Sequence, residues 1–124
     1  MSKVQREAQG EVTVKRSRFY AVLLPIQDQA ALDRWLAERR KALKKACHHC
    51  WAARWIEGDG KLVEQAQNDG EVGRPGLRLL NLLQQHDLQG ALVVSRIFGG
   101  VKLGPGGVGR AFRQAGLAAL DARG

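Results

Sequence analysis

The stretch GALVVSRIFGGVKLGPGGVG, residues 90–109, decides the fold of this chain. It begins with an apolar, β-branched run at 91–96, which predicts an interior strand, and continues into a glycine-rich segment that contains Lys102. A helical pattern then runs over about 107–122. Glycine allows positive φ angles and close approach of a ligand to the main chain, and a helix start directs free N–H groups at that ligand. The stretch therefore predicts a strand, a loop and a helix arranged to suit an anion.

Strands and helices mix through the rest of the chain. Alternating, aromatic and β-branched side chains predict strands, two of them adjacent and antiparallel near the start. Helical spacing of apolar side chains predicts two further helices, with Asp28 as the N-cap of one and Pro75 in the first turn of the other. This order predicts an α+β sandwich whose helices pack on one face of the sheet. The strands are expected at 11–16, 18–24, 47–56 and 61–66, and the helices at 28–45 and 75–86.

Composition indicates one globular domain. The chain has 124 residues, of which 44% are hydrophobic and 26% charged, as in ordinary folded proteins. Its longest apolar runs are far shorter than the roughly 20 residues that a bilayer span needs. The first ten residues contain no apolar stretch that would serve as a signal peptide. We therefore expect a cytoplasmic protein that does not bind a membrane.

The net charge of +8 makes attraction to polyanions plausible. Three Trp, three Phe and one Tyr give little sign of a base-stacking platform. A basic cluster near the end of the first predicted helix is interpreted as a solvated helix terminus, where cations also suit the helix dipole. The alternative is that it borders one basic groove together with Arg96, Lys102, Arg110 and Arg113. The cluster consists of Arg39, Arg40, Lys41, Lys44 and Lys45.

Three separated motifs resemble those of the IMPACT/YigZ-like family. The segment VSRIFGGVKLGPGG at 94–107 is similar to the family signature and departs from it only at Ile97, which replaces an aromatic residue. KRSRF at 15–19 and HHCWAARWI at 48–56 resemble two further family motifs. The acidic loop NDGEVGRP at 68–75 is several residues shorter than the family pattern. The resemblance covers nearly the whole chain.

The resemblance implies a fold like domain 2 of a small-subunit ribosomal protein, with a mixed sheet and a left-handed βαβ crossover. Bacterial relatives usually add a ferredoxin-like domain after this one. We expect that domain to be absent here, so that residues 1–124 form a single Impact N-terminal-like domain. Eukaryotic relatives regulate translation by competing for an activator of a starvation-responsive kinase, and for the bacterial members nucleic-acid or ribosome binding is the usual suggestion.

The glycine-rich segment is predicted to bind phosphate, because cationic side chains accompany free helix N–H groups. The alternative is a tight strand-to-helix connection whose glycines only permit packing. Asp69 and Glu71 are interpreted as turn residues. Alternatively, they face the glycine loop across a cleft and bind Mg²⁺ or order Lys102. The predicted anion-binding residues are Arg96, Gly99, Gly100, Lys102, Gly104, Gly106, Gly107 and Arg110.

The CHHC segment at 47–50 suggests zinc or a Cys–His nucleophile pair. Structural zinc draws on two separated ligand pairs, and the sequence offers no second pair. In a strand, Cys47 and Cys50 would point to opposite faces, which also argues against a redox pair. We therefore predict no metal and no cofactor, and we expect His48 and Cys50 to be packed in the core.

These observations favour a non-catalytic protein that binds phosphates of RNA or the ribosome, with a role near translation. A second hypothesis is a protein-interaction module whose basic face meets an acidic protein. A third is a small enzyme acting on a phosphorylated metabolite, with Asp69, Glu71 and Lys102 in its cleft. The sequence makes no prediction of the oligomeric state.

Overall fold

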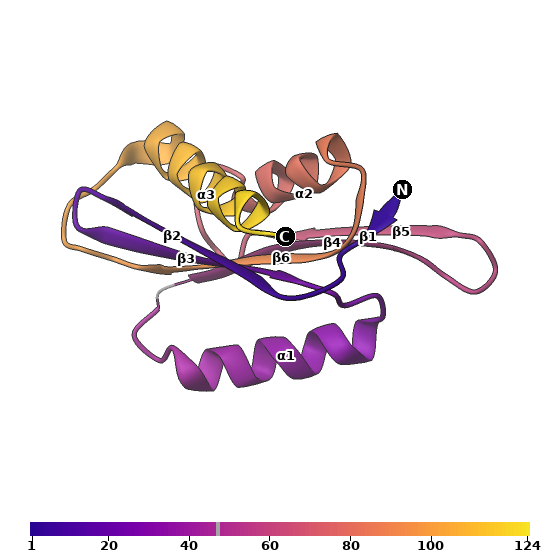
Figure 1. Cartoon of the computed structure of the whole chain (residues 1–124). Helices are drawn as coiled ribbons and strands as arrows, with labels where there is room; N and C mark the ends of the chain where they lie inside the picture. Colours follow the sequence, from indigo (N-terminus) through magenta and orange to yellow (C-terminus); the bar gives the residue numbers. More distant parts are fainter. Residues whose placement is uncertain (47) are drawn as a thin grey trace.

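In the computed structural model, which describes residues 1–46 and 48–124, strands form one mixed sheet with helices on both of its faces (Figure 1). The strand order is β2-β3-β6-β4-β5, with every neighbouring pair antiparallel, and β1 pairs in parallel with the start of β6. The α+β class and the mixed sheet are thus confirmed. The elements are β1 (Ser2–Lys3), β2 (Ala8–Val14), β3 (Ser17–Leu24), α1 (Gln29–Ala42), β4 (His48–Ile56), β5 (Leu62–Gln67), α2 (Pro75–Gln85), β6 (Leu88–Ile97) and α3 (Gly104–Asp121).

Strand β6 is the centre of the sheet, as its apolar run predicted. Every residue of β6 except Ile97 is buried, because β3 and β4 pair with its two sides and helices cover both of its faces. Since β3 and β4 are both antiparallel to β6, they run parallel to each other, and α1 connects them. The crossover implied by the family resemblance is therefore present, and its left-handed sense stays a prediction.

The expectation that the helices share one face of the sheet is wrong. Helices α2 and α3 cover one face, and α1 lies on the other (Figure 1). Two separate cores result, one containing Leu92 and Phe112 and the other Val93 and Leu32. Leu92 and Val93 are neighbours in β6, so they point to opposite faces, and both are completely buried. A central strand that is apolar on both faces requires cover on both.

This arrangement also separates the two basic clusters that the sequence allowed to border one groove. Arg39, Arg40 and Lys41 of the cluster belong to α1, on one face of the sheet, whereas Arg110 and Arg113 belong to α3, on the other. The single basic groove is therefore wrong. Asp28 caps α1 as predicted, because its carboxylate accepts a hydrogen bond of 2.8 Å from the Ala31 N–H.

Helix α3 begins at Gly104, earlier than the predicted 107. Pro105 has the φ angle that suits a first helical turn, and Gly104 adopts a φ of 72° at the entry to the helix. The glycine-rich segment is thus divided: Gly99 and Gly100 lie in the loop, and the later glycines lie in the helix. Within the described residues, no helix is long and apolar enough to span a bilayer.

Candidate functional site

Three segments meet at one end of the sheet: the β2–β3 turn, the loop after β6 and the first turn of α3 (Figure 1). Gly99 is where the first two touch. A Cβ on Gly99 would lie 2.1 Å from the Arg16 carbonyl carbon, and the Gly99 N–H donates a 3.1 Å hydrogen bond to Ser17 Oγ. Gly99 is therefore required for packing within the protein, and its role as a ligand contact stays a prediction.

The β2–β3 turn presents two cations on a tight backbone. Lys15 and Arg16 have φ angles of 45° and 71°, and they connect the paired residues Val14 and Ser17. Two successive positive φ angles are the geometry of the two-residue turns that match the twist of a hairpin. Both side chains are exposed. The turn therefore holds them beside the glycine loop.

The start of α3 lacks a capping side chain. Its N-cap residue, Leu103, makes no side-chain hydrogen bond to the helix, and its first turn carries no acidic residue. Gly104 and Gly106 are exposed there. The Arg110 guanidinium lies over this turn, with Nη1 3.1 Å from the position that a Cβ on Gly106 would take. Uncapped N–H groups and the helix dipole thus add to the positive charge of Arg110.

A shallow hollow of about 190 Å³ lies between this turn and the hairpin, with Lys15, Gly107, Arg110 and Gln114 among its lining residues. Lys15, Arg16, Lys102 and Arg110 are all exposed. Across residues 1–46 and 48–124, none of the four has an ion-pair partner within 4.0 Å. Their charge is therefore free to attract an anion.

Arg96 does not belong to this exposed set. It is only 6% exposed, and its Nη1 lies 3.0 Å from Glu71 Oε2. The rings of Phe19 and Phe98 lie 5.5 and 5.4 Å from its guanidinium carbon. The predicted phosphate contact through Arg96 is therefore wrong: the guanidinium is occupied by a carboxylate and enclosed by aromatic rings.

Asp69 and Glu71 are engaged by basic groups other than Lys102. Glu71 pairs with Arg96 and lies 3.6 Å from His48 Nε2. The Asp69 carboxylate accepts a 2.7 Å hydrogen bond from the His49 N–H and pairs with Arg40 at 3.4 Å. Burial alone would raise the pKa of Asp69, but the backbone hydrogen bond and Arg40 outweigh it and lower that pKa. The turn interpretation therefore suits both acids better than the Lys102 alternative.

The shortened acidic loop supports the start of α3. Gly73 has a φ of 84°, and a Cβ there would lie 2.3 Å from the Pro105 carbonyl oxygen. Arg78 on α2 donates a 3.0 Å hydrogen bond from Nε to the Gly73 carbonyl and also packs on Gly109. The loop thus acts as a spacer between α2 and the first turns of α3.

The described part of the CHHC segment is built into the core. Cys50 is fully buried, burial raises the pKa of its thiol, and Sγ donates to the Asn68 carbonyl. His49 Nδ1 lies 2.7 Å from Ser95 Oγ, and burial, together with Arg40, lowers its pKa. His48 is half-buried, and Cys47 lies outside the described residues. Within those residues, no group of three or more His, Cys, Asp or Glu side chains is placed to hold a metal ion.

Sequence comparison identifies the family of this domain. The model of the Impact N-terminal domain matches residues 15–120. The chain belongs to the Impact N-terminal domain family. It is 31% identical over 111 residues to the IMPACT family member YvyE of Bacillus subtilis. The aligned residues cover 88% of this chain and 50% of YvyE. The chain therefore spans about half the length of this relative.

Two solved structures share the fold of this Impact N-terminal domain. One, described as a hypothetical protein, superposes with a TM-score of 0.80 and 25% identity over 96% of this chain and 59% of its own. The other is Yih1, described as a two-domain translational regulator, with a TM-score of 0.61 and 25% identity over 98% of this chain and 49% of its own.

Sequence reasoning missed Lys15 and Arg16 as site residues. Both stood inside a family motif, but the expected strand at 11–16 included them, so they were interpreted as strand residues. The signal for a turn was that the alternation of apolar residues stops after Val14. Phe98, which is 46% exposed, was also not singled out.

Proposed function

We propose that this Impact N-terminal domain is a non-catalytic module that binds phosphates of RNA, free or in the ribosome, and acts near translation in the cytoplasm. The observation that carries the proposal is the uncapped first turn of α3 beside four exposed cations without ion-pair partners in the described chain. The proposed site comprises Lys15, Arg16, Gly100, Lys102, Gly104, Gly106, Gly107 and Arg110.

The chemistry of this surface suits a phosphate backbone. Backbone N–H groups and guanidinium groups both recognise phosphate oxygens. Such contacts position a nucleic acid and carry no direct sequence information, so the domain would show little base preference. Each phosphate contact releases counterions, so affinity would fall steeply with salt. The relation to Yih1, a translational regulator, agrees with a role near translation.

An interaction with an acidic protein is a second candidate, and exposed apolar side chains favour it. Phe98 and Val101, in the loop after β6, are 46% and 38% exposed, and Val72, in the acidic loop, is 52% exposed. Apolar side chains beside cations suit a protein surface of mixed character. The third hypothesis, an enzyme with Asp69, Glu71 and Lys102 in one cleft, loses its premise, because both acids are paired with other groups.

Fluorescence anisotropy with a short mixed-sequence RNA tests the proposal. Titrations of nuclease-treated protein at about 50 and 200 mM salt span the range in which phosphate contacts are revealed. We expect the affinity of the wild type for RNA to fall steeply from the lower to the higher salt concentration. We expect binding to be lost in the Lys102→Glu, Arg110→Glu double variant. Lys61 in the β4–β5 turn and Arg34 on α1 are exposed cations, so the double variant Lys61→Glu, Arg34→Glu provides a control with the same change in net charge. Binding that is unchanged in the double variant would place the site elsewhere, and no binding at low salt would favour the protein partner.

A further inference from the structure

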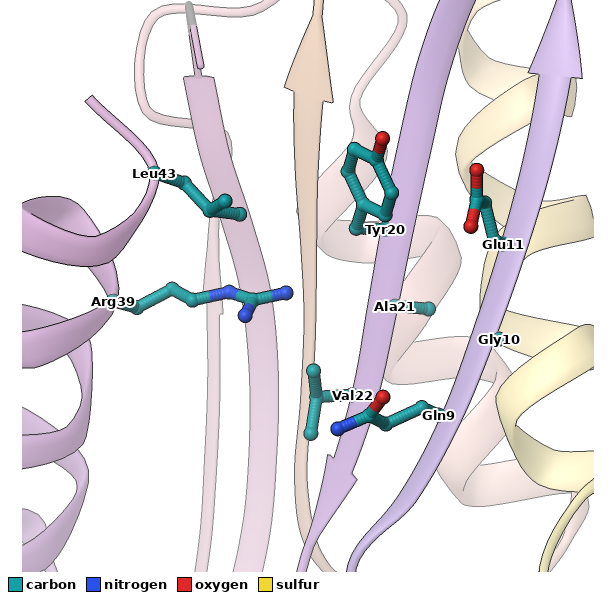
Figure 2. A pocket seen from close by; sticks show the side chains of 8 residues that line it. All are labelled: Gln9, Gly10, Glu11, Tyr20, Ala21, Val22, Arg39 and Leu43. Carbon is teal, nitrogen blue, oxygen red and sulfur yellow. The ribbon is translucent and has the colours of Figure 1, made fainter. Parts of the chain in front are cut away.

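A second groove lies on the opposite face of the sheet, between α1 and strands β2 and β3 (Figure 2). It has a volume of about 360 Å³, and we call it the α1 groove. A neighbouring hollow of about 230 Å³ shares Gln9, Val22 and Arg39 with it and continues along the helix to Trp35. The α1 groove is lined by Gln9, Gly10, Glu11, Tyr20, Ala21, Val22, Arg39 and Leu43.

The groove exists because the sheet extends beyond the cover that α1 provides. Val22 on β3 is buried beneath the helix, whereas Gln9 and Glu11 on the edge strand β2 are exposed. Figure 2 shows Arg39 reaching from α1 across the sheet toward β3, with Leu43 beside it. One side of the groove is therefore formed by the helix, and its floor is formed by the edge strand β2 and its neighbour β3.

Arg39 is the unusual group in this groove. Its side chain is half-buried, and its Nε is inaccessible to solvent without a hydrogen-bond partner. Its guanidinium carbon lies 5.5 Å from the centre of the Trp35 ring, which supports the flat face of the cation. Within the described chain, no carboxylate lies within 4.0 Å of it. A partly desolvated cation without an acceptor is costly, and a bound carboxylate would relieve that cost.

The surroundings of Arg39 limit the class of anion. Glu7 and Glu38 line the neighbouring hollow, and Glu11 lies at the strand side of the groove. Glu38 is paired with Lys41 at 3.5 Å, and the remaining negative charge near the groove repels a dianion or polyanion more strongly than a monoanion, so this groove differs from the phosphate surface at α3. Val22 and Leu43 offer an apolar contact beside the cation. A volume near the lower end of the range for ligand pockets suits a small molecule.

We propose that the α1 groove binds a small monocarboxylate with a short apolar body. The Arg39 guanidinium holds the carboxylate, and Val22 and Leu43 contact the body. The Tyr20 side chain, half-buried on β3, forms the far wall. This site is independent of the proposed RNA surface, because the two lie on opposite faces of the sheet.

The test is a titration of the isotopically labelled full chain with benzoate, followed by ¹H–¹⁵N NMR. We expect saturable shifts of the Tyr20 and Val22 amides and of the Arg39 Nε–H signal, which is sensitive to an acceptor bound by the guanidinium. Benzamide has the same shape without the charge, so it should bind at least about tenfold more weakly, as expected for a lost hydrogen bond to a charged group.

Variants locate the site. Arg39→Gln should weaken benzoate about tenfold or more, whereas Arg34→Gln, which changes an exposed arginine on the same helix, should leave it unchanged. Arg39→Lys keeps the charge and provides a second variant if the glutamine form is unstable; it should also bind more weakly, because it lacks the planar fork. Equal shifts with benzamide, unchanged binding in the Arg39 variants, or no saturable shift in the wild type would each overturn the proposal.

Discussion

Arg96 and Glu71 form a buried ion pair that joins the central strand to the acidic loop. Their closest atoms, Nη1 and Oε2, are 3.0 Å apart, and the two side chains are 7% and 6% exposed. Ser17 Oγ lies 3.4 Å from the other Arg96 amino group and also accepts the Gly99 N–H. The pair therefore fixes the acidic loop, and through Ser17 the glycine loop, to the same strand end.

Removing one partner of this pair should destabilise the domain strongly. Glu71→Gln leaves the Arg96 charge buried without a carboxylate, so we expect the free energy of unfolding to fall by about 3–5 kcal/mol. Urea denaturation measures the change. The matched control is Glu57→Gln, an exposed glutamate in the β4–β5 turn, which should change stability by less than about 0.5 kcal/mol. Equal effects of the two substitutions would mean that the Arg96 pair is not a stabilising contact.

Gly99→Ala should destabilise the domain and disturb the hairpin turn. The added Cβ would meet the Arg16 backbone at 2.1 Å, and a backbone atom cannot move aside as the end of a side chain can. We expect a loss of at least about 1–3 kcal/mol, the usual cost of overpacking. At Gly58 a Cβ meets nothing within 4 Å, so Gly58→Ala should be nearly neutral. Thermal unfolding of both variants compares them, and a stable Gly99→Ala protein would contradict the contact.

Local patterns predicted every element except the two-residue strand β1, and longer-range contacts account for what they missed. The apolar run of β6, the Asp28 cap and Pro75 at the start of α2 are local signals, and all three are confirmed. Arg96 looked like a ligand contact because it precedes the glycines, but its partner Glu71 lies 25 residues away in the chain. Only the fold brings the two together. The cover on both faces of β6 was missed, although consecutive apolar residues in a strand point to opposite faces and so indicate burial of both.

The depressed pKa of Asp69 makes the domain sensitive to acid. Because the folded-state pKa lies below the ordinary value of 3.8, the folded protein binds fewer protons than the unfolded chain near that pH. The stability from Asp69 is complete above the ordinary value and is lost as the pH falls through the folded-state pKa. Urea midpoints measured between about pH 2 and 6 should therefore fall less steeply on acidification in Asp69→Asn than in the wild type. Asp59→Asn, in an exposed turn, is the control, and parallel curves for wild type and Asp69→Asn would contradict the prediction.

Single-charge variants should separate phosphate contacts from general attraction. If Lys15 and Lys102 each contact one phosphate, Lys15→Gln and Lys102→Gln should each reduce the slope of log K against log salt by about 0.7 on single-stranded RNA. A general effect of the +8 net charge would instead be matched by Lys61→Gln, which removes the same charge at the other end of the sheet. The discriminating result is the difference between slopes, because all three variants lower the net charge equally. A smaller slope for Lys102→Gln but not for Lys15→Gln would restrict the site to the start of α3. Equal slopes for all three variants would remove the phosphate site from this end of the fold.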